Sequence, residues 1–221
     1  MNAVLYIVIT NLAIGSCLLP VGMLFSRKMR RVATYRLLAL YWLLNGLIHF
    51  TDIYFFYSFR DSRLDRLTTY YDVVDTPLAL LLFASAATGR HRKLLISTML
   101  LFVVAEIVVV EWKGFDVTSG FLFISAGVLL VIAWCITGLI LFMRKMEYTP
   151  FESSMVVIYV ALLFAYGSFL IIALFLHLRG YTEGNSKDGY LLYYISLLLS
   201  SVITSVGLWS YGLRRRPQLA M

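Results

Sequence analysis

Charged residues are scarce in this sequence, and their scarcity excludes an ordinary soluble domain. Only 14% of the residues are charged, whereas 61% are hydrophobic. A typical soluble domain carries about a quarter charged residues. A chain of 221 residues cannot bury so much apolar surface in a core of its own. The excess apolar surface therefore indicates a protein whose solvent is lipid.

Several other features are also missing. Four prolines and no low-complexity stretch leave no room for a linker, so we expect a single membrane domain over residues 1–221. The two cysteines, Cys17 and Cys135, lie inside apolar runs, which favours small buried side chains over a disulfide. There is no Gly-rich phosphate loop and no Asn-x-Ser/Thr triplet. We therefore expect the plasma (inner) membrane of a bacterium.

The sequence contains seven apolar runs that are long enough to cross a bilayer, which takes roughly 20 residues per helix. They do not alternate with a period of two, as the strands of a barrel would. Lipid offers no partner to a bare backbone, so the runs must be helical. We predict an all-α, seven-transmembrane bundle with spans at about 3–25, 34–57, 68–88, 94–112, 121–143, 154–178 and 190–213.

The basic residues predict the orientation. The net charge of +7 is divided among short clusters between apolar runs, which is typical of membrane topology rather than of nucleic-acid binding. With the N-terminus outside and the C-terminus inside, twelve basic residues face inward: Arg27, Lys28, Arg30, Arg31, Arg90, Arg92, Lys93, Arg144, Lys145, Arg214, Arg215 and Arg216. Six face outward: Arg60, Arg63, Arg66, Lys113, Arg179 and Lys187. The first run has four basic residues just after it, so we expect an anchor and not a cleaved signal peptide.

Ionisable side chains inside the predicted spans form one layer near the outer face. Asn45, His49 and Asp52 are spaced i, i+4, i+7 on one stripe of the second span. Asp72 and Asp75 lie one turn apart on the third span, and Glu106 lies on the fourth. At a rise of about 1.5 Å per residue, the aspartates lie some 6–10 Å below the outer surface. Neighbouring antiparallel helices would bring these groups together, and intramembrane charges are functional candidates by default.

Three interpretations of this layer stay open. It is an interhelical hydrogen-bond network, a binding site for a ligand, proton or cation, or a catalytic or metal site. His49 with Asp52, Asp72 and Asp75 is compatible with a divalent metal, although no second histidine stands at ligand spacing. His91 and His177 are read as a solvated and an interfacial residue. Aromatic residues such as Tyr71 fit an interfacial belt or the wall of an apolar pocket.

The chain resembles the microbial rhodopsins in its seven predicted spans, outside N-terminus, short loops and length. Local similarity is carried by residues 75–80 (DTPLAL), 164–167 (FAYG) and 202–207 (VITSVG), with the basic exit LRRR at 213–216. The resemblance implies a rhodopsin-like bundle in which Tyr166 lines the cavity that the family uses for retinal.

The departures from that family concern its chemistry. The lysine that holds retinal is replaced by Ser205, and no lysine occurs in the seventh span. Ser201 stands in place of the counter-ion aspartate of that span. The sandwiching tryptophans correspond to apolar residues or to Asp72. We therefore expect no covalent retinal and no resident cofactor, and a free apolar ligand stays open.

A second, shorter resemblance covers about 20 residues of the second span. Arg36, Trp42, Gly46, His49 and Asp52 are placed similarly to a helix of sterol-isomerase-like membrane proteins. It implies that a histidine and a nearby acid face a lipid pocket. That family's spacing is longer than His-x-x-Asp, and its members have fewer helices.

These observations lead to one functional expectation and its alternative. We expect a sensor or receptor-like module that binds its ligand at Asn45, His49, Asp52, Tyr71, Asp72, Asp75, Glu106, Tyr166 and Ser205. The expected partners are membrane lipid and a membrane protein or a second copy, without nucleic acid. The alternative is an intramembrane isomerase or hydrolase acting on a lipid or isoprenoid through His49 and the aspartates. A transporter ranks third, because clear internal repeats and broken helices are lacking.

Overall fold

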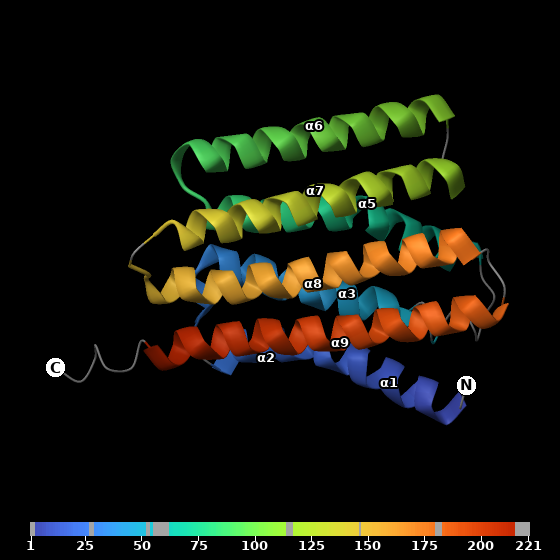
Figure 1. Ribbon diagram of the computed structural model, residues 1–221, viewed down its shortest axis with the longest axis horizontal. Coiled ribbons are helices and arrows are strands. Elements are labelled where there is room, and N and C mark those ends of the chain that lie inside the picture. The colour runs from blue at the N-terminus through green and yellow to red at the C-terminus, as the bar shows by residue number, and fades with distance from the viewer. Residues whose placement is uncertain are drawn as a thin grey trace. The chain divides into compact units, whose positions relative to one another are not determined.

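The computed structural model of the protein describes the backbone of residues 3–26, 29–51, 54, 62–113, 117–145, 147–179 and 183–214. Within these ranges, it leaves out the side chains of residues 3, 26, 30, 62–72, 113, 117–123, 176–179, 183–190 and 212–214. Every element in the described ranges is helical, as the sequence predicts, and they contain no strand. The elements are α1 (Ala3–Ser16), α2 (Leu18–Ser26), the 3-10 helix η1 (Met29–Arg31), α3 (Ala33–Thr51), α5 (Ser62–Ala86), α6 (Gly89–Lys113), α7 (Val117–Met143), α8 (Pro150–Arg179) and α9 (Glu183–Arg214) (Figure 1).

Five stretches of the described chain are long and apolar enough to cross a membrane. They are Val4–Phe25, Gly89–Trp112, Ile124–Met143, Pro150–Phe175 and Leu191–Tyr211. Val73–Ala86 in α5 is a shorter apolar helix. α3, which carries Arg36, Asn45 and His49, does not belong to the five. The protein is therefore an integral membrane protein by the length and composition of its helices.

Two sequence predictions about element boundaries differ from the structure. The stretch at 179–189 was expected to be an outer loop, but α8 continues to Arg179 and α9 begins at Glu183. Hydropathy marks the part of a helix that lies in lipid, whereas the helical backbone extends beyond it into polar residues. The first apolar run is also not one helix, because α1 ends at Ser16 and α2 begins at Leu18.

Proline accounts for the interruption of the first run. Pro20 has no amide hydrogen and cannot bond to the carbonyl of Ser16, four residues earlier. Around the interruption, the amide of Cys17 donates to the carbonyl of Ile14 at 3.2 Å. The carbonyl of Ala13 accepts instead from the Ser16 hydroxyl at 2.7 Å and the Cys17 thiol at 3.4 Å. Local side chains thus satisfy the acceptors that the break exposes.

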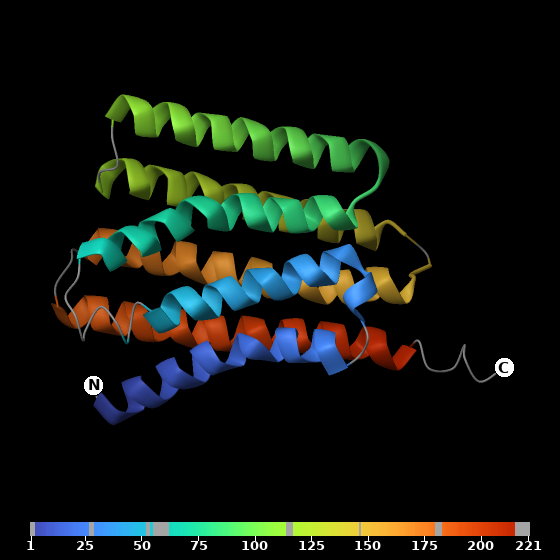
Figure 2. The ribbon, with the colours of Figure 1, turned by 180° about the vertical axis from the view of Figure 1, so that it is seen from behind.

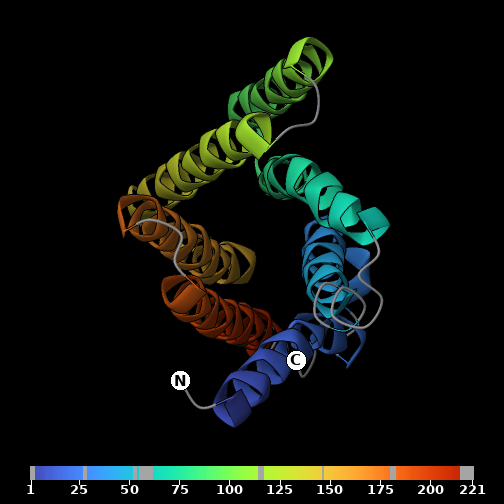
Figure 3. The same ribbon diagram turned by 90° about the vertical axis from the view of Figure 1, so that its right-hand side faces the viewer.

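The helices divide into two compact units. The first comprises residues 1–29 and 132–221, and in it α9 packs against α8, α1 and α2 (Figures 1 and 3). Small polar residues on α9 permit the close approach of α8: Ser196, Ser200 and Thr204 are buried at four-residue spacing. At Gly207, a Cβ atom would lie 3.1 Å from Cβ of Val157 and 3.3 Å from the carbonyl oxygen of Ser154. Small residues of this kind drive helix association in membranes.

The second unit, residues 30–131, holds most of the polar residues of interest. In it, α5 packs against both α3 and α6 (Figure 2). The Ser85 hydroxyl near the end of α5 donates to the Thr34 hydroxyl near the start of α3 at 3.0 Å. The chain then reverses at Gly89, whose φ of 58° lies in the left-handed region that favours glycine. α5 is therefore antiparallel to both of its neighbours.

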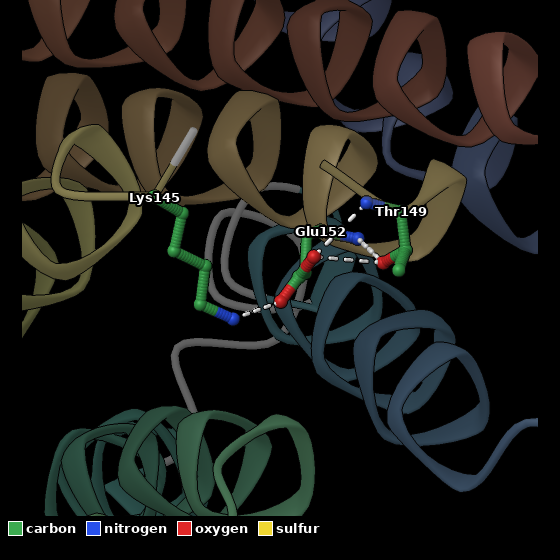
Figure 4. Close-up of polar contacts among 3 residues, drawn as sticks. All are labelled: Lys145, Thr149 and Glu152. Atoms are coloured by element: carbon green, nitrogen blue, oxygen red, sulfur yellow. Dashed lines mark hydrogen bonds and ion pairs between the residues drawn. The ribbon is translucent and has the colours of Figure 1, made fainter. Parts of the chain in front are cut away.

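The connection from α7 to α8 contains a reciprocal cap (Figure 4). The Thr149 amide donates to Oε2 of Glu152 at 3.0 Å, and the Glu152 amide donates to the Thr149 hydroxyl at 3.2 Å. Pro150 occupies the first helical position between them, which suits its fixed φ. Lys145 forms an ion pair with Oε1 of Glu152. This arrangement is a capping box, and it fixes where α8 begins.

Candidate functional site

Glu106 is a buried acid on a helix whose described side chains are mostly exposed or half-buried. Of the described side chains of α6, only those of Leu95 and Glu106 are fully buried, each 3% exposed. The two positions are eleven residues apart, which places them within about 20° of each other around the helix. Oε1 of Glu106 is buried and has no hydrogen-bond partner among the described residues. A leucine at this position would bury more favourably, so stability does not explain the acid.

A close junction of three helices lies one turn from Glu106. A Cβ built on Gly127 of α7 would collide with the Thr76 hydroxyl of α5. The same Cβ would lie 3.2 Å from Cζ of Phe102 of α6. Thr76 is 4% exposed, so its hydroxyl is inside the unit. The junction constrains the register, because Thr76, the ring of Phe102 and Gly127 meet in one place.

The register brings Glu106 to within about one helical turn of the level of the aspartates of α5. Glu106 follows Phe102 by four residues, and Asp72 precedes Thr76 by four residues on the described backbone of α5. Because the two helices are antiparallel, both steps lead about 6 Å in the same direction. Asp75 lies next to Thr76, between the junction and Asp72. The structure therefore supports one shared level for residues that are distant in sequence.

The Thr34–Ser85 hydrogen bond extends this register to α3. Asn45 lies eleven residues after Thr34, which is about 16 Å along α3. Asp75 lies ten residues before Ser85, which is about 15 Å along α5. His49 lies about 22 Å along α3, close to the roughly 20 Å that separates Asp72 from Ser85. Asn45 is 5% exposed and lies on the same helical face as Thr34. That face is the one that meets α5.

Proline adds a backbone acceptor at this depth. Pro77 lies inside α5 and cannot donate a hydrogen bond to the carbonyl of Val73. This carbonyl belongs to the same turns of α5 as Asp72 and Asp75. Carbonyls released from a membrane helix are tolerated where they line a polar site, and they coordinate cations in other membrane proteins. The layer therefore combines carboxyl, amide and carbonyl oxygens with the imidazole of His49.

The predicted site residues lie in different units, and some of them lie outside the described residues. Asn45, His49, Asp75 and Glu106 all belong to the second unit; Asn45 and Glu106 are buried, and His49 and Asp75 are half-buried. Asp52 lies outside the described residues, as do the side chains of Tyr71 and Asp72. Among the side chains that the structure does describe, no three of His, Cys, Asp and Glu are grouped to hold a metal. The metal site of His49 with the three aspartates stays a prediction.

Tyr166 and Ser205 lie in the first unit, with Ser201. All three are buried. The Ser205 hydroxyl donates to the carbonyl of Ser201 at 2.9 Å, and the Ser201 hydroxyl donates to that of Leu198 at 2.9 Å. These bonds occupy the hydroxyls within α9 itself, which is a common arrangement for buried serines in membrane helices.

The sequence names Thr76 only as part of the DTPLAL stretch and does not predict the junction. Phe102 is an ordinary member of an apolar run, and Gly127 becomes informative only once α5 and α6 lie beside it. Comparisons with protein-family models, with characterised proteins and with solved structures yield no match to this chain. The polar layer of the second unit is therefore the candidate functional site.

Proposed function

We propose that this chain is a seven-helix membrane protein that senses a cation, either a proton or a metal cation, at the polar layer of the second unit. The layer consists of Asn45, His49, Asp52, Tyr71, Asp72, Asp75 and Glu106. The observation that carries the proposal is the buried carboxyl oxygen of Glu106, which has no hydrogen-bond partner among the described residues. Carboxyl groups that lie close together share protons or bind a cation rather than all carrying charge.

The remaining features of the proposal come from the sequence. The N-terminus is outside and the C-terminus inside the plasma membrane of a bacterium, in agreement with the distribution of basic residues. The bundle is rhodopsin-like without covalent retinal, since Ser205 replaces the lysine. Output passes to a membrane-protein partner or a second copy of the chain.

Thermal unfolding of the detergent-purified protein tests this function. A cation that binds the folded state raises the melting temperature in proportion to the logarithm of its concentration. The wild type, Glu106→Gln and Glu111→Gln are compared in Na⁺, K⁺, Mg²⁺ and Ca²⁺ series, and across pH in a separate series. Glu111→Gln is the matched control, because Glu111 lies on the same helix but is exposed.

We expect the wild type and Glu111→Gln to respond alike and Glu106→Gln to lose the response. A response to pH alone assigns a proton site, and a response to one metal cation assigns a metal site. Identical behaviour of all three proteins in every series contradicts the proposal.

A further inference from the structure

One end of the second unit carries five exposed basic side chains. They come from the N-terminal ends of two helices and the segment before the first, and we call them the basic end: Arg31, Arg36, Arg90, Arg92 and Lys93. None of them forms an ion pair with another described residue. The first turns of α3 and α6 contain no acidic residue.

The two helix starts are neighbours in space. The hydrogen bond of 3.0 Å between Ser85 and Thr34 fixes the end of α5 beside the start of α3. Only four residues separate Ser85 from Gly89, where α6 begins. The basic end is therefore one surface.

No carboxylate of the second unit is available to neutralise this surface. Residues 30–51 and 76–105 contain no aspartate or glutamate. Asp75 lies about 15 Å from Ser85 along α5, and Glu106 is farther still. Cations at the start of a helix are also unfavourable to its dipole, whose positive end lies there. Both effects leave a concentrated positive charge without a partner among the described residues of the second unit.

The connection between α7 and α8 differs from the basic end, because its basic residues have acidic residues beside them. There Lys145 pairs with Glu152, and Glu147 lies between them in sequence. This chain therefore neutralises basic residues at one helix connection and leaves them unneutralised at the other. Positive-inside topology alone explains basic residues at both connections and does not explain this difference.

We propose that the basic end binds the phosphate groups of anionic phospholipids. Helix N-termini and arginine side chains are the two protein elements best suited to phosphate, through backbone amides and bidentate guanidinium hydrogen bonds. The surface includes the beginning of the apolar stretch Gly89–Trp112, where a membrane-crossing helix would meet the lipid headgroups. Each basic residue near an anionic bilayer surface strengthens binding roughly fivefold. The site is distinct from the polar layer, which lies some 15–20 Å away along the helices.

Native mass spectrometry of the detergent-purified protein tests this proposal, with phosphatidylglycerol as the anionic probe and phosphatidylcholine as the zwitterionic one. Arg90→Gln/Arg92→Gln removes two charges from the basic end. Arg144→Gln/Lys145→Gln removes two charges from the α7–α8 connection and serves as the matched control. Arg90→Lys/Arg92→Lys retains the charge. Thermal melting of each variant establishes that it is folded.

We expect Arg90→Gln/Arg92→Gln to weaken phosphatidylglycerol binding at least tenfold, with phosphatidylcholine binding unchanged. The control pair should change it less than threefold. The lysine variant should weaken it less than Arg90→Gln/Arg92→Gln does, because it retains the charge but not the bidentate hydrogen bonds. An equal loss in both glutamine pairs would mean unspecific attraction and would overturn the proposal. Displacement of the lipid by millimolar inorganic phosphate would overturn it as well, because the site would then serve free phosphate.

Discussion

The hydroxyl oxygen of Ser16 in α1 lies 2.5 Å from that of Ser201 in α9. Ser16 is the last residue before the interruption at Cys17. The Ser16 hydroxyl is also within hydrogen-bond distance of the Ala13 carbonyl, and the Ser201 hydroxyl of the Leu198 carbonyl. The two hydroxyls together have two protons to donate to these three contacts. This pair is the polar link that holds the interrupted first span against the last helix.

A double-mutant cycle measures that link. Ser16→Ala and Ser201→Ala should each lower the free energy of unfolding by about 1 kcal/mol, and the double variant should cost little more than either. Ser210→Ala is the control, since its hydroxyl bonds only to the carbonyl of Gly207 within α9. Additive losses, measured by unfolding in mixed micelles, would mean that the two serines do not interact.

Gly127 allows α5, α6 and α7 to meet. Gly127→Ala forces a methyl group into the Thr76 hydroxyl, so we expect a loss of about 1–3 kcal/mol in unfolding free energy. At Gly15 a Cβ would meet no heavy atom within 4 Å, and Gly15→Ala should stabilise α1 slightly. A neutral Gly127→Ala would show that the three helices are not packed as described.

The capping box at α8 predicts a graded loss of stability. Thr149→Ala removes the acceptor for the Glu152 amide and should cost about 1 kcal/mol. Lys145→Gln should cost less, within about 1 kcal/mol, because the Lys145 side chain is more than half exposed. Thermal melting of both variants checks this order. A larger loss for Lys145→Gln would make the ion pair, rather than the cap, the stabilising element.

We expect the glutamate at position 106 to lower the free energy of unfolding relative to an apolar residue there. One oxygen of its buried carboxyl has no partner among the described residues, so Glu106→Leu should raise the unfolding free energy by about 1–3 kcal/mol in the absence of added cations. Leu95→Ala, at the other buried position of α6, should lower it by about 2–5 kcal/mol. A destabilised Glu106→Leu would instead identify the layer as an interhelical hydrogen-bond network, the structural interpretation that the sequence left open.

The sequence predicts five of the membrane-crossing helices well, because lipid imposes one rule on every span; the seven-helix count stays a prediction. Gly89–Trp112 and Leu191–Tyr211 match the predicted runs 94–112 and 190–213 to within a few residues at each end. The break at Cys17 could have been inferred from Pro20, and the capping box from the Thr-Pro-Phe-Glu spacing at 149–152. Both signals are local, and apolar length alone overlooks them.

The candidate site is only partly readable from sequence. The spacing of Asn45, His49 and the aspartates places them on one face of each predicted span. Glu106 joins them because it lies at a similar distance from the predicted outer end of its span. The contacts of Thr76, Phe102 and Gly127 depend on how α5, α6 and α7 are aligned, which no local pattern specifies. Tyr166 and Ser205 came from a family resemblance, and the structure places them in the other compact unit.

Infrared difference spectroscopy tests the central claim most directly, because it observes the Glu106 carboxyl itself. Spectra are recorded with and without the cation that stabilises the wild type, or at two pH values if only the proton does. We expect a carboxyl–carboxylate difference band in the wild type and in Glu111→Gln, and its loss in Glu106→Gln. Superimposable difference spectra for the wild type and Glu106→Gln would contradict a cation site at Glu106.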